Sequence, residues 1–296
     1  MKFYIFIILL IPILGTSQLL DNRKCSVFSD DNFFYSTFIK KNKIRKITGV
    51  ISTKKSLQVI EQRNLVNTYL FDKQGRLGKQ YRSFNHSTKK DTTFFTYLYN
   101  SDSHVVTKRT SDSYGFFSNN YAFNSDGLMV SKTYCRDENI GVNKNNFKLG
   151  KQHIIVEETF SHQKTDSTKS IKTFNTHGKQ YQIFTTYFNE LGFVNKEVKK
   201  LIINKKKSII TYRYNDMGLV SEKTVFPNFN KKENTAQKFK YDEFGNLEYI
   251  DEYNNEKHIT HKEIIYNKST FLMKALLIQD IETNYIKIIK YKYEYW

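Results

Sequence analysis

Aromatic and polar residues alternate with a period of two along most of this chain. Pairs of aromatic residues two positions apart recur as Tyr69/Phe71, Tyr97/Tyr99, Tyr121/Phe123, Tyr212/Tyr214 and Phe239/Tyr241. Near the C-terminus, Tyr291, Tyr293 and Tyr295 alternate with Lys292 and Glu294. Alternation with aromatic and β-branched enrichment is typical of strands that bury one face. The pattern therefore predicts an all-β protein.

A short motif punctuates these strands: an aromatic residue, then Asp or Asn, two variable residues, and Gly. Six copies begin at Phe71, Phe123, Phe174, Phe188, Tyr214 and Tyr241, and two degenerate copies begin at Tyr99 and Tyr266. The aromatic positions are 28, 24, 51, 14, 26, 27 and 25 residues apart, a period near 26. The interval of 14 places either the Phe174 or the Phe188 turn at the opposite end of a hairpin, and the spacing does not say which.

The motif residues have a structural explanation. An Asp or Asn side chain at the start of a turn accepts hydrogen bonds from the backbone just ahead of it, and Gly adopts the left-handed conformation that closes the turn. The predicted turn residues are Asp72, Gly75, Asn124, Gly127, Asn175, Gly178, Asn189, Gly192, Asn215, Gly218, Asp242 and Gly245. About two strands per period predict antiparallel β-hairpin repeats, stacked into an elongated meander or solenoid-like sheet.

Two of the copies carry a family resemblance. The segments 69–77, Tyr-Leu-Phe-Asp-Lys-Gln-Gly-Arg-Leu, and 239–247, Phe-Lys-Tyr-Asp-Glu-Phe-Gly-Asn-Leu, resemble the YD repeat of RHS proteins, with the signature Tyr-x-Tyr-Asp-x-x-Gly-Arg-Leu. Most other copies depart from it by having Asn for Asp. The resemblance implies stacked β-hairpins and kinship with small secreted repeat proteins of the Bacteroidetes type. It does not imply an activity.

The ends of the chain differ from the repeats. Residues 1–17 have a basic start, an apolar run and small residues before Gln18, which predicts a secretory signal peptide cleaved after Ser17. No later segment is apolar enough for a transmembrane helix. We expect an N-terminal cap over residues 18–60, β-hairpin repeats over 61–270 and C-terminal capping strands over 271–296. The protein is therefore expected to be exported, to the periplasm, the cell surface or the extracellular space.

The charge of the chain suggests a general class of partner without identifying one. The formal net charge is +18, and loss of the signal peptide lowers it to +17. Only 8 of the 47 basic residues are Arg, and the forked guanidinium of Arg is the side chain that specific nucleic-acid readers favour. Specific nucleic-acid binding is therefore disfavoured. An envelope protein or an anionic glycan is the partner that the charge suggests.

Residues with catalytic or metal-binding chemistry are sparse. Cys25 and Cys135 are the only thiols, and the sequence leaves open whether they form a disulfide. His258 and His261 are three residues apart, so on a regular strand they point to opposite faces and do not share a metal. Asp72 and Asp242 form no catalytic pair, since Asn replaces Asp in most equivalent turns. We expect no enzyme activity, no cofactor and no metal.

The C-terminus is the candidate binding surface. Tyr291, Tyr293, Tyr295 and Trp296 end the chain and are expected to stay partly exposed. Counting back from Trp296 by twos gives the charged residues Glu294, Lys292 and Lys290. That parity does not fit the lipid-facing terminal strand of an outer-membrane barrel.

The sequence favours an exported, non-enzymatic repeat protein that acts as a binding or scaffold module of the cell envelope. The first alternative is an envelope-acting hydrolase or a toxin-associated RHS-like factor. The second alternative is an outer-membrane β-barrel, which repeated hairpins also suggest.

Overall fold

The computed structural model describes residues 18–86, 89–112, 114–142, 144–228 and 232–296, so the predicted signal peptide lies outside the described residues. The first elements are α1 (Ser36–Lys41), β1 (Ile44–Lys54), β2 (Glu61–Phe71), β3 (Leu77–His86), β4 (Lys89–Tyr99), β5 (Val105–Asp112), β6 (Gly115–Phe123), β7 (Met129–Asn139) and the 3-10 helix η1 (Lys144–Asn146). Then follow β8 (Leu149–Lys164), β9 (Thr168–Phe174), β10 (Gln180–Phe188), β11 (Val194–Leu201), β12 (Lys207–Tyr214) and β13 (Val220–Phe226). The last strands are β14 (Thr235–Tyr241), β15 (Leu247–Asn254), β16 (Lys257–Tyr266), β17 (Met273–Asp280) and β18 (Ile286–Tyr295).

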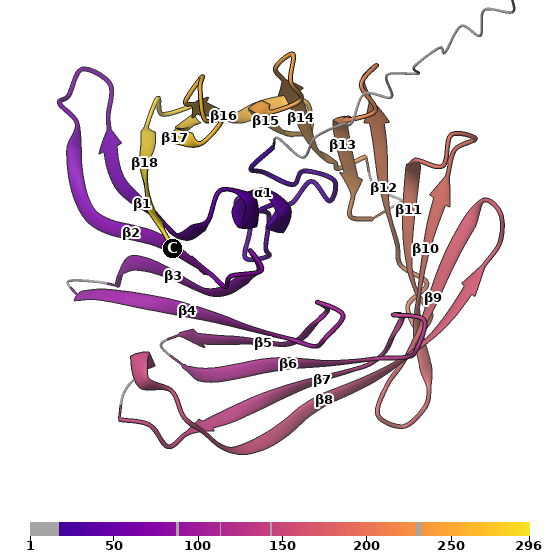
Figure 1. Cartoon of the computed structure of the whole chain (residues 1–296). Helices are drawn as coiled ribbons and strands as arrows, with labels where there is room; N and C mark the ends of the chain where they lie inside the picture. Colours follow the sequence, from indigo (N-terminus) through magenta and orange to yellow (C-terminus); the bar gives the residue numbers. More distant parts are fainter. Residues whose placement is uncertain (1–17, 87–88, 113, 143, 229–231) are drawn as a thin grey trace, which may run out of the picture.

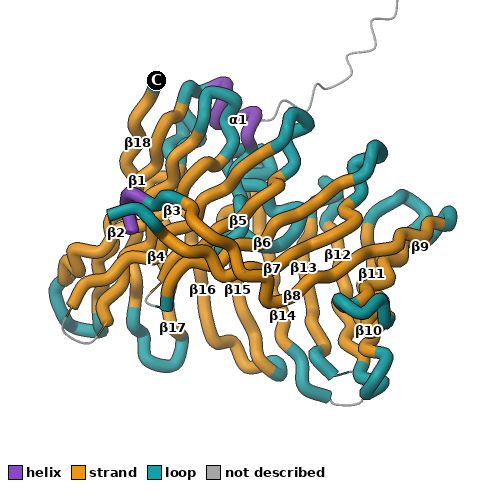
Figure 2. Tube along the Cα trace, turned by 90° about the horizontal axis from the view of Figure 1, so that it is seen from below, coloured by secondary structure: helices purple, strands orange, loops and turns teal. Residues whose placement is uncertain are grey.

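The strands form one closed antiparallel β-barrel. Each strand pairs with the next in sequence, and β18 pairs with β1 from Ile44↔Tyr295 to Lys54↔Ile286. Figures 1 and 2 show the resulting 18-stranded wall. The prediction of antiparallel hairpins is confirmed, but the predicted elongated, open sheet is wrong. The closed barrel is the architecture of the second alternative.

The closing contact explains this error. The repeat period reports only how each strand pairs with its neighbour in sequence. Closure depends on β1 meeting β18, about 250 residues later, and so on strand tilt and stagger summed around the ring. A closed barrel also leaves no strand edge exposed.

The repeat turns gather at one end of the barrel. Five of the six Gly-bearing turns follow the even-numbered strands β2, β6, β10, β12 and β14, and the two degenerate turns follow β4 and β16. The sixth, the Phe174 turn, follows β9. The Phe188 turn, after β10, is therefore in register, and the Phe174 turn lies at the opposite end. The remaining even-numbered strand of this series, β8, is followed by a tight turn without the motif, where Thr165 N–H donates to Thr168 O at 2.9 Å.

A row of tyrosine hydroxyls links successive strands near these turns. The hydroxyl of a tyrosine at or near the end of one strand donates to the carbonyl of the residue that begins the preceding strand. The pairs are Tyr99 to Leu77, Tyr214 to Val194, Tyr241 to Val220, Tyr266 to Leu247 and Tyr293 to Met273, at 2.7–2.9 Å. Each bond satisfies a main-chain acceptor beside a turn bulge. Where a copy of the motif begins with Tyr rather than Phe, its hydroxyl contributes to the wall as well as its ring.

The N-terminal segment, residues 18–43, lies inside the ring of strands and is called the plug here (Figure 1). It folds back on itself through the Leu20↔Phe34 bridge and then forms α1. Its apolar residues join one core cluster with β1–β4 and β13–β18. An 18-stranded ring is too wide for wall side chains alone to fill, so the plug provides the missing core.

Alternate residues of the wall face the plug and the solvent. On β18, Ile289, Tyr291 and Tyr293 pack on the core cluster, whereas Lys290 and Lys292 occupy the positions between. On β15, Ile250 is 1% exposed in the core, and its neighbour Asp251 lies on the outer face. The barrel is therefore apolar inside and polar outside along these strands.

The regions predicted as caps have other places in the fold. Residues 18–43 form the plug, whereas β1, β17 and β18 are strands of the wall. Sealing strands are not needed where the ends of the sheet meet each other. Within the described ranges, no helix has the length and apolar character required to cross a membrane.

Candidate ligand cavity and other functional sites

A cavity of about 600 Å³ lies between the plug and the wall strands β4–β7. The plug packs on the wall at β4, and the cavity separates the plug from the strands that follow, β5–β7. Tyr97, Tyr121 and Phe123 line it from the wall, and Phe34 and Tyr35 line it from the plug. A space of this size is typical of pockets for small organic ligands.

The aromatic lining is held in place by specific contacts. The Tyr97 hydroxyl donates to the carbonyl of Asp30 in the plug at 2.8 Å. The imidazole of His104 stacks on the Phe123 ring, with centroids 4.7 Å apart. Burial raises the pKa of Tyr99 to about 12, so this wall residue stays protonated at neutral pH. Hydrogen bonding and ring stacking thus hold the aromatic side chains that the wall contributes to the cavity.

Charged groups from both the plug and β5 line the cavity. Arg23 donates to Asp21 at 2.6 Å and lies over the Tyr35 ring, and Lys108 of β5 bridges to Asp31 at 2.6 Å. Burial alone would raise the pKa of Asp21, but the hydrogen bonds from Arg23 outweigh it and hold that pKa below its ordinary value. Lys24 also lines the cavity and forms no ion pair with a described residue, so the lining has a surplus positive charge.

A second cavity, of about 530 Å³, lies on the outer face beside the chain that links β7 to β8. Phe147 packs on Phe116 with centroids 4.7 Å apart, and Arg109 lies 4.6 Å from the Phe147 ring centre. Beneath them, Arg109 Nε donates to the buried carboxylate of Asp137 at 2.5 Å. Ser118 and Gln152 donate to the other carboxylate oxygen at 2.9 and 2.7 Å. This network holds η1 and its flanks on the wall.

The predicted turn residues have the geometry expected for them but do not converge on a site. All six motif glycines have positive φ, from 70° to 81°. Asp72 Oδ1 accepts from the N–H groups of Gln74 and Arg76 at 3.0 and 2.9 Å. Equivalent bonds occur at Asn124, Asn175, Asn189, Asn215 and Asp242. These residues lie around the ends of the barrel and shape its rims.

The two cysteines are free and buried. Cys25 belongs to the plug core, and burial raises its pKa to about 11. Cys135 lies on β7 outside that cluster, paired in register with Ser118 and accepting from Asn120 Nδ2 at 3.6 Å. The disulfide left open by the sequence is therefore not formed.

The C-terminal aromatic residues divide between core and surface. Tyr291 and Tyr293 pack on the core cluster, whereas Tyr295 and Trp296 are 51% and 53% exposed. Lys73 Nζ lies 5.8 Å from the centre of a Trp296 ring. Only two of the four residues thus remain available as a surface.

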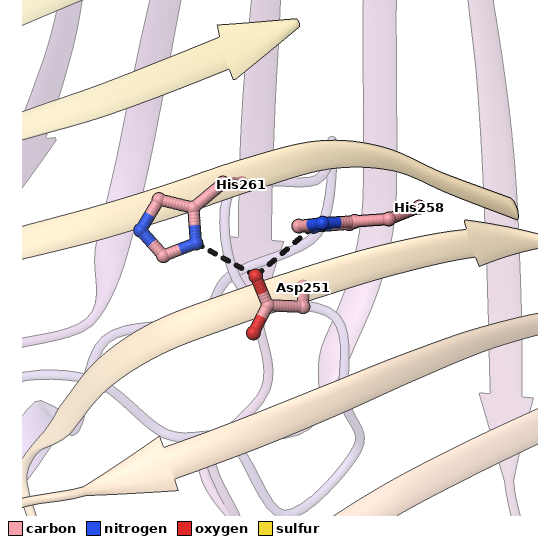
Figure 3. A group of neighbouring side chains, drawn as sticks. All are labelled: Asp251, His258 and His261. Atoms are coloured by element: carbon pink, nitrogen blue, oxygen red, sulfur yellow. Dashed lines mark hydrogen bonds and ion pairs between the residues drawn. The ribbon is translucent and has the colours of Figure 1, made fainter. Parts of the chain in front are cut away.

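His258 and His261 lie on the same, outer face of the barrel, contrary to the expectation that they point apart. The pairing of β15 with β16 slips between Glu252↔Thr260 and Tyr253↔His258, a β-bulge that turns His258 to the face of His261. Both imidazoles reach Asp251 of β15, as Figure 3 shows. The sequence does not mark this bulge, because no Gly occurs between residues 246 and 271.

The cavity residues of the plug were missed from sequence. Residues 18–43 carry no repeat copy, so the sequence predicts a cap there rather than part of a ligand cavity. The signal that was present is the density of aromatic residues at Phe28, Phe33, Phe34, Tyr35 and Phe38. Such a cluster in a short segment indicates a surface that packs on another part of the chain.

Comparison with known proteins does not place this chain in a family. No family model matches it, and no curated protein matches it. Solved structures that resemble it include a porin-like protein from Bacteroides uniformis, with 14% identity, a TM-score of 0.41, and 86% of this chain and 97% of that chain covered. Another is a porin-like protein from Bacteroides vulgatus, with 8% identity, a TM-score of 0.31, and coverage of 85% and 98%.

A third structure, TcdB2-TccC3, shows 9% identity and a TM-score of 0.23 over 75% of this chain and 15% of that chain. Likenesses this distant carry no argument about activity. The assignment to RHS or YD-repeat proteins is corrected, since no family model matches and the hairpins close into a barrel. The residues that suggested it form turns and strands that antiparallel hairpins use whatever their family.

Proposed function

We propose that this chain is a non-enzymatic β-barrel of the cell envelope that binds an acidic oligosaccharide in the cavity between plug and wall. The observation that carries the proposal is the composition of that cavity, where aromatic rings from both sides face a positively charged edge. Sugar rings stack on aromatic faces, and Lys and Arg donate charge-assisted hydrogen bonds to carboxylate or phosphate groups.

The arrangement of charges supports binding of an anion. Asp21 and Asp31, two acidic residues of the lining, are each engaged by a cation. The ammonium group of Lys24 can therefore form an ion pair with an acidic group of the ligand. The surplus of 18 positive charges over the chain favours the approach of an anionic glycan from a distance.

The test is calorimetric titration with trigalacturonate, using galactotriose as the neutral match. We expect trigalacturonate to bind, and Lys24→Gln to weaken it about tenfold or more through loss of a charge-assisted bond. Tyr121→Leu should also weaken binding, through loss of stacking.

The matched controls are Lys205→Gln, in the exposed turn between β11 and β12, and Tyr187→Leu on β10 outside the cavity. Both should bind like the parent chain. Equal binding of the acidic and neutral sugars, or an equal loss in the controls, would contradict the proposal.

A second candidate function is that of a membrane-spanning barrel, which is favoured by closure with an even number of strands. The outer face weighs against it. Lys196, Lys238 and Lys290 lie within wall strands at positions that face away from the core cluster. Charged residues on a lipid-facing strand cost about 2–4 kcal/mol each at the bilayer midplane.

Fractionation of cells that express the chain separates the two candidates. The ligand-binding barrel should leave membranes in carbonate at high pH and fold in buffer without detergent. A protein that stays with the membrane after carbonate, and folds only with detergent or lipid, would favour the spanning barrel.

A further inference from the structure

We propose that Asp251, His258 and His261 form a binding site for a divalent transition-metal ion of the zinc class on the outer wall of the barrel. His261 Nδ1 lies 2.6 Å and His258 Nε2 lies 3.1 Å from Asp251 Oδ1 (Figure 3). All three ligand atoms lie within 4.8 Å of one another. Ligands arranged tetrahedrally around zinc at about 2.0–2.1 Å lie about 3.3 Å apart, so small side-chain shifts admit an ion.

The side chains are supported by strands rather than by loops. His261 pairs in register with Asp251 across β15 and β16, and the β-bulge brings His258 beside them. His258 stacks on Tyr253 at 4.8 Å, and His261 stacks on Tyr249 at 5.5 Å. The aromatic supports flank Asp251 on its own face of β15. A site held in this way loses little entropy when it binds an ion.

The chemistry of the three groups indicates the class of ion. Two imidazoles and one carboxylate suit zinc, cobalt, nickel or copper better than the all-oxygen coordination that calcium and magnesium take. Three protein ligands leave a position open for water or for a ligand from outside the chain.

A cation on the neighbouring strand, Lys238, has a contact of its own beside the site. Lys238 of β14 is the register partner of Asp251, and its Nζ lies 4.8 Å from the Tyr253 ring centre. That contact directs the ammonium group onto an aromatic face. On the other side, His261 pairs with the neutral Gln279 of β17.

The experiment is titration of the chelator-treated full chain with zinc sulfate by calorimetry, and with cobalt chloride by visible absorption. We expect one ion per chain and cobalt bands of four- or five-coordinate geometry. His258→Gln, His261→Gln and Asp251→Asn should each weaken zinc at least about 100-fold, since even outer partners of metal ligands contribute 10–100-fold.

Controls distinguish this site from adventitious binding and from misfolding. His153→Gln and His177→Gln change exposed histidines elsewhere and should bind zinc like the parent chain. The three site variants should keep the parent circular dichroism spectrum without metal, because their side chains lie on the outer face. Absence of stoichiometric zinc binding, or unchanged binding in the three variants, would overturn the site. The proposal is independent of the sugar cavity, and either can fail without the other.

Discussion

The wall of the barrel is packed differently on its two sides. On the plugged side, β1–β4 and β13–β18, inward residues such as Tyr69, Leu77 and Ile250 are at most 5% exposed and join one core with the plug. On the open side, β5–β12, the only described hydrophobic residues that are buried are Cys135 and Val198, and neither belongs to that core. The same alternating pattern is present on both sides.

The difference shows that the repeat makes a wall but not a core. A strand buries its inner face only where another layer covers it, and here the covering layer is the plug. The open side has polar contacts instead, including the buried pair of Arg109 and Asp137 on its outer face. The candidate sugar cavity lies at the boundary between the plugged side and the open side of the wall.

The largest expected effect comes from removing the centre of the plug. Phe33 is 1% exposed, and its ring contacts Phe34 at 4.6 Å and Tyr69 at 5.7 Å. Phe33→Ala should lower the free energy of unfolding by about 3–5 kcal/mol, the cost of deleting a buried aromatic ring. Denaturant unfolding followed by tryptophan fluorescence measures it.

The matched variant on the open side is Phe184→Ala, where the ring is only half-buried on β10. It should cost less than half as much. Labelling of Cys25 in a Cys135→Ser background reports release of the plug separately, since Cys25 is buried with it. Equal costs for the two Phe variants would show that both sides of the wall carry a core.

The next largest effect concerns the polar network of the open side. Arg109→Met should lower the free energy of unfolding by about 3 kcal/mol, because it leaves the carboxylate of Asp137 buried and unpaired. The double variant Arg109→Met with Asp137→Leu should regain much of this loss. Thermal melting of the parent chain, Arg109→Met, Asp137→Leu and the double variant gives the coupling energy. A double variant less stable than Arg109→Met would contradict this account.

Two turn glycines separate backbone strain from contact with the plug. Gly75 has φ +80°, and a Cβ there would collide with the carbonyl oxygen of Ser36 in α1, whereas Gly178 has φ +70° and open space around it. Both substitutions to Ala incur left-handed strain of about 1–2 kcal/mol. Gly75→Ala should cost about 1–3 kcal/mol more, because α1 must move. Chemical denaturation of the two variants tests this difference, and equal costs would show that α1 does not press on the turn.

The smallest effect is a dependence on pH from the plug. The pKa of Asp21 is held below its ordinary value, so its ion pair with Arg23 stabilises the fold above the unfolded pKa, about 3.9. That contribution is lost as pH falls through the lower folded value. Since Arg23 is 73% exposed, Asp21→Asn should cost less than about 1 kcal/mol at pH 7.

The difference between Asp21→Asn and the parent chain should shrink as the pH falls below about 4. Urea midpoints measured from pH 3 to pH 7 follow it. A difference that stays constant over this range would assign the effect to packing rather than to charge.

Local patterns were enough to predict the hairpins, because a turn depends on residues within five positions of one another. Asp72 and Gly75 form the expected turn through bonds to their near neighbours. The C-terminal strand was predicted with Lys290 and Lys292 on its polar face, and the structure places them there. The His258–His261 geometry was not predictable, since a single β-bulge reverses the face of one histidine.

The sequence by itself determined the strands, their antiparallel order and the turns at their ends, since these follow from alternation and from turn chemistry over short distances. Only the tertiary structure decided that β18 returns to β1, that residues 18–43 enter the ring, and that three side chains meet at Asp251. These features depend on the twist and stagger summed over 18 strands. No local pattern encodes that sum. The repeat therefore predicted the strands of the wall, but not that the wall closes or that residues 18–43 lie inside it.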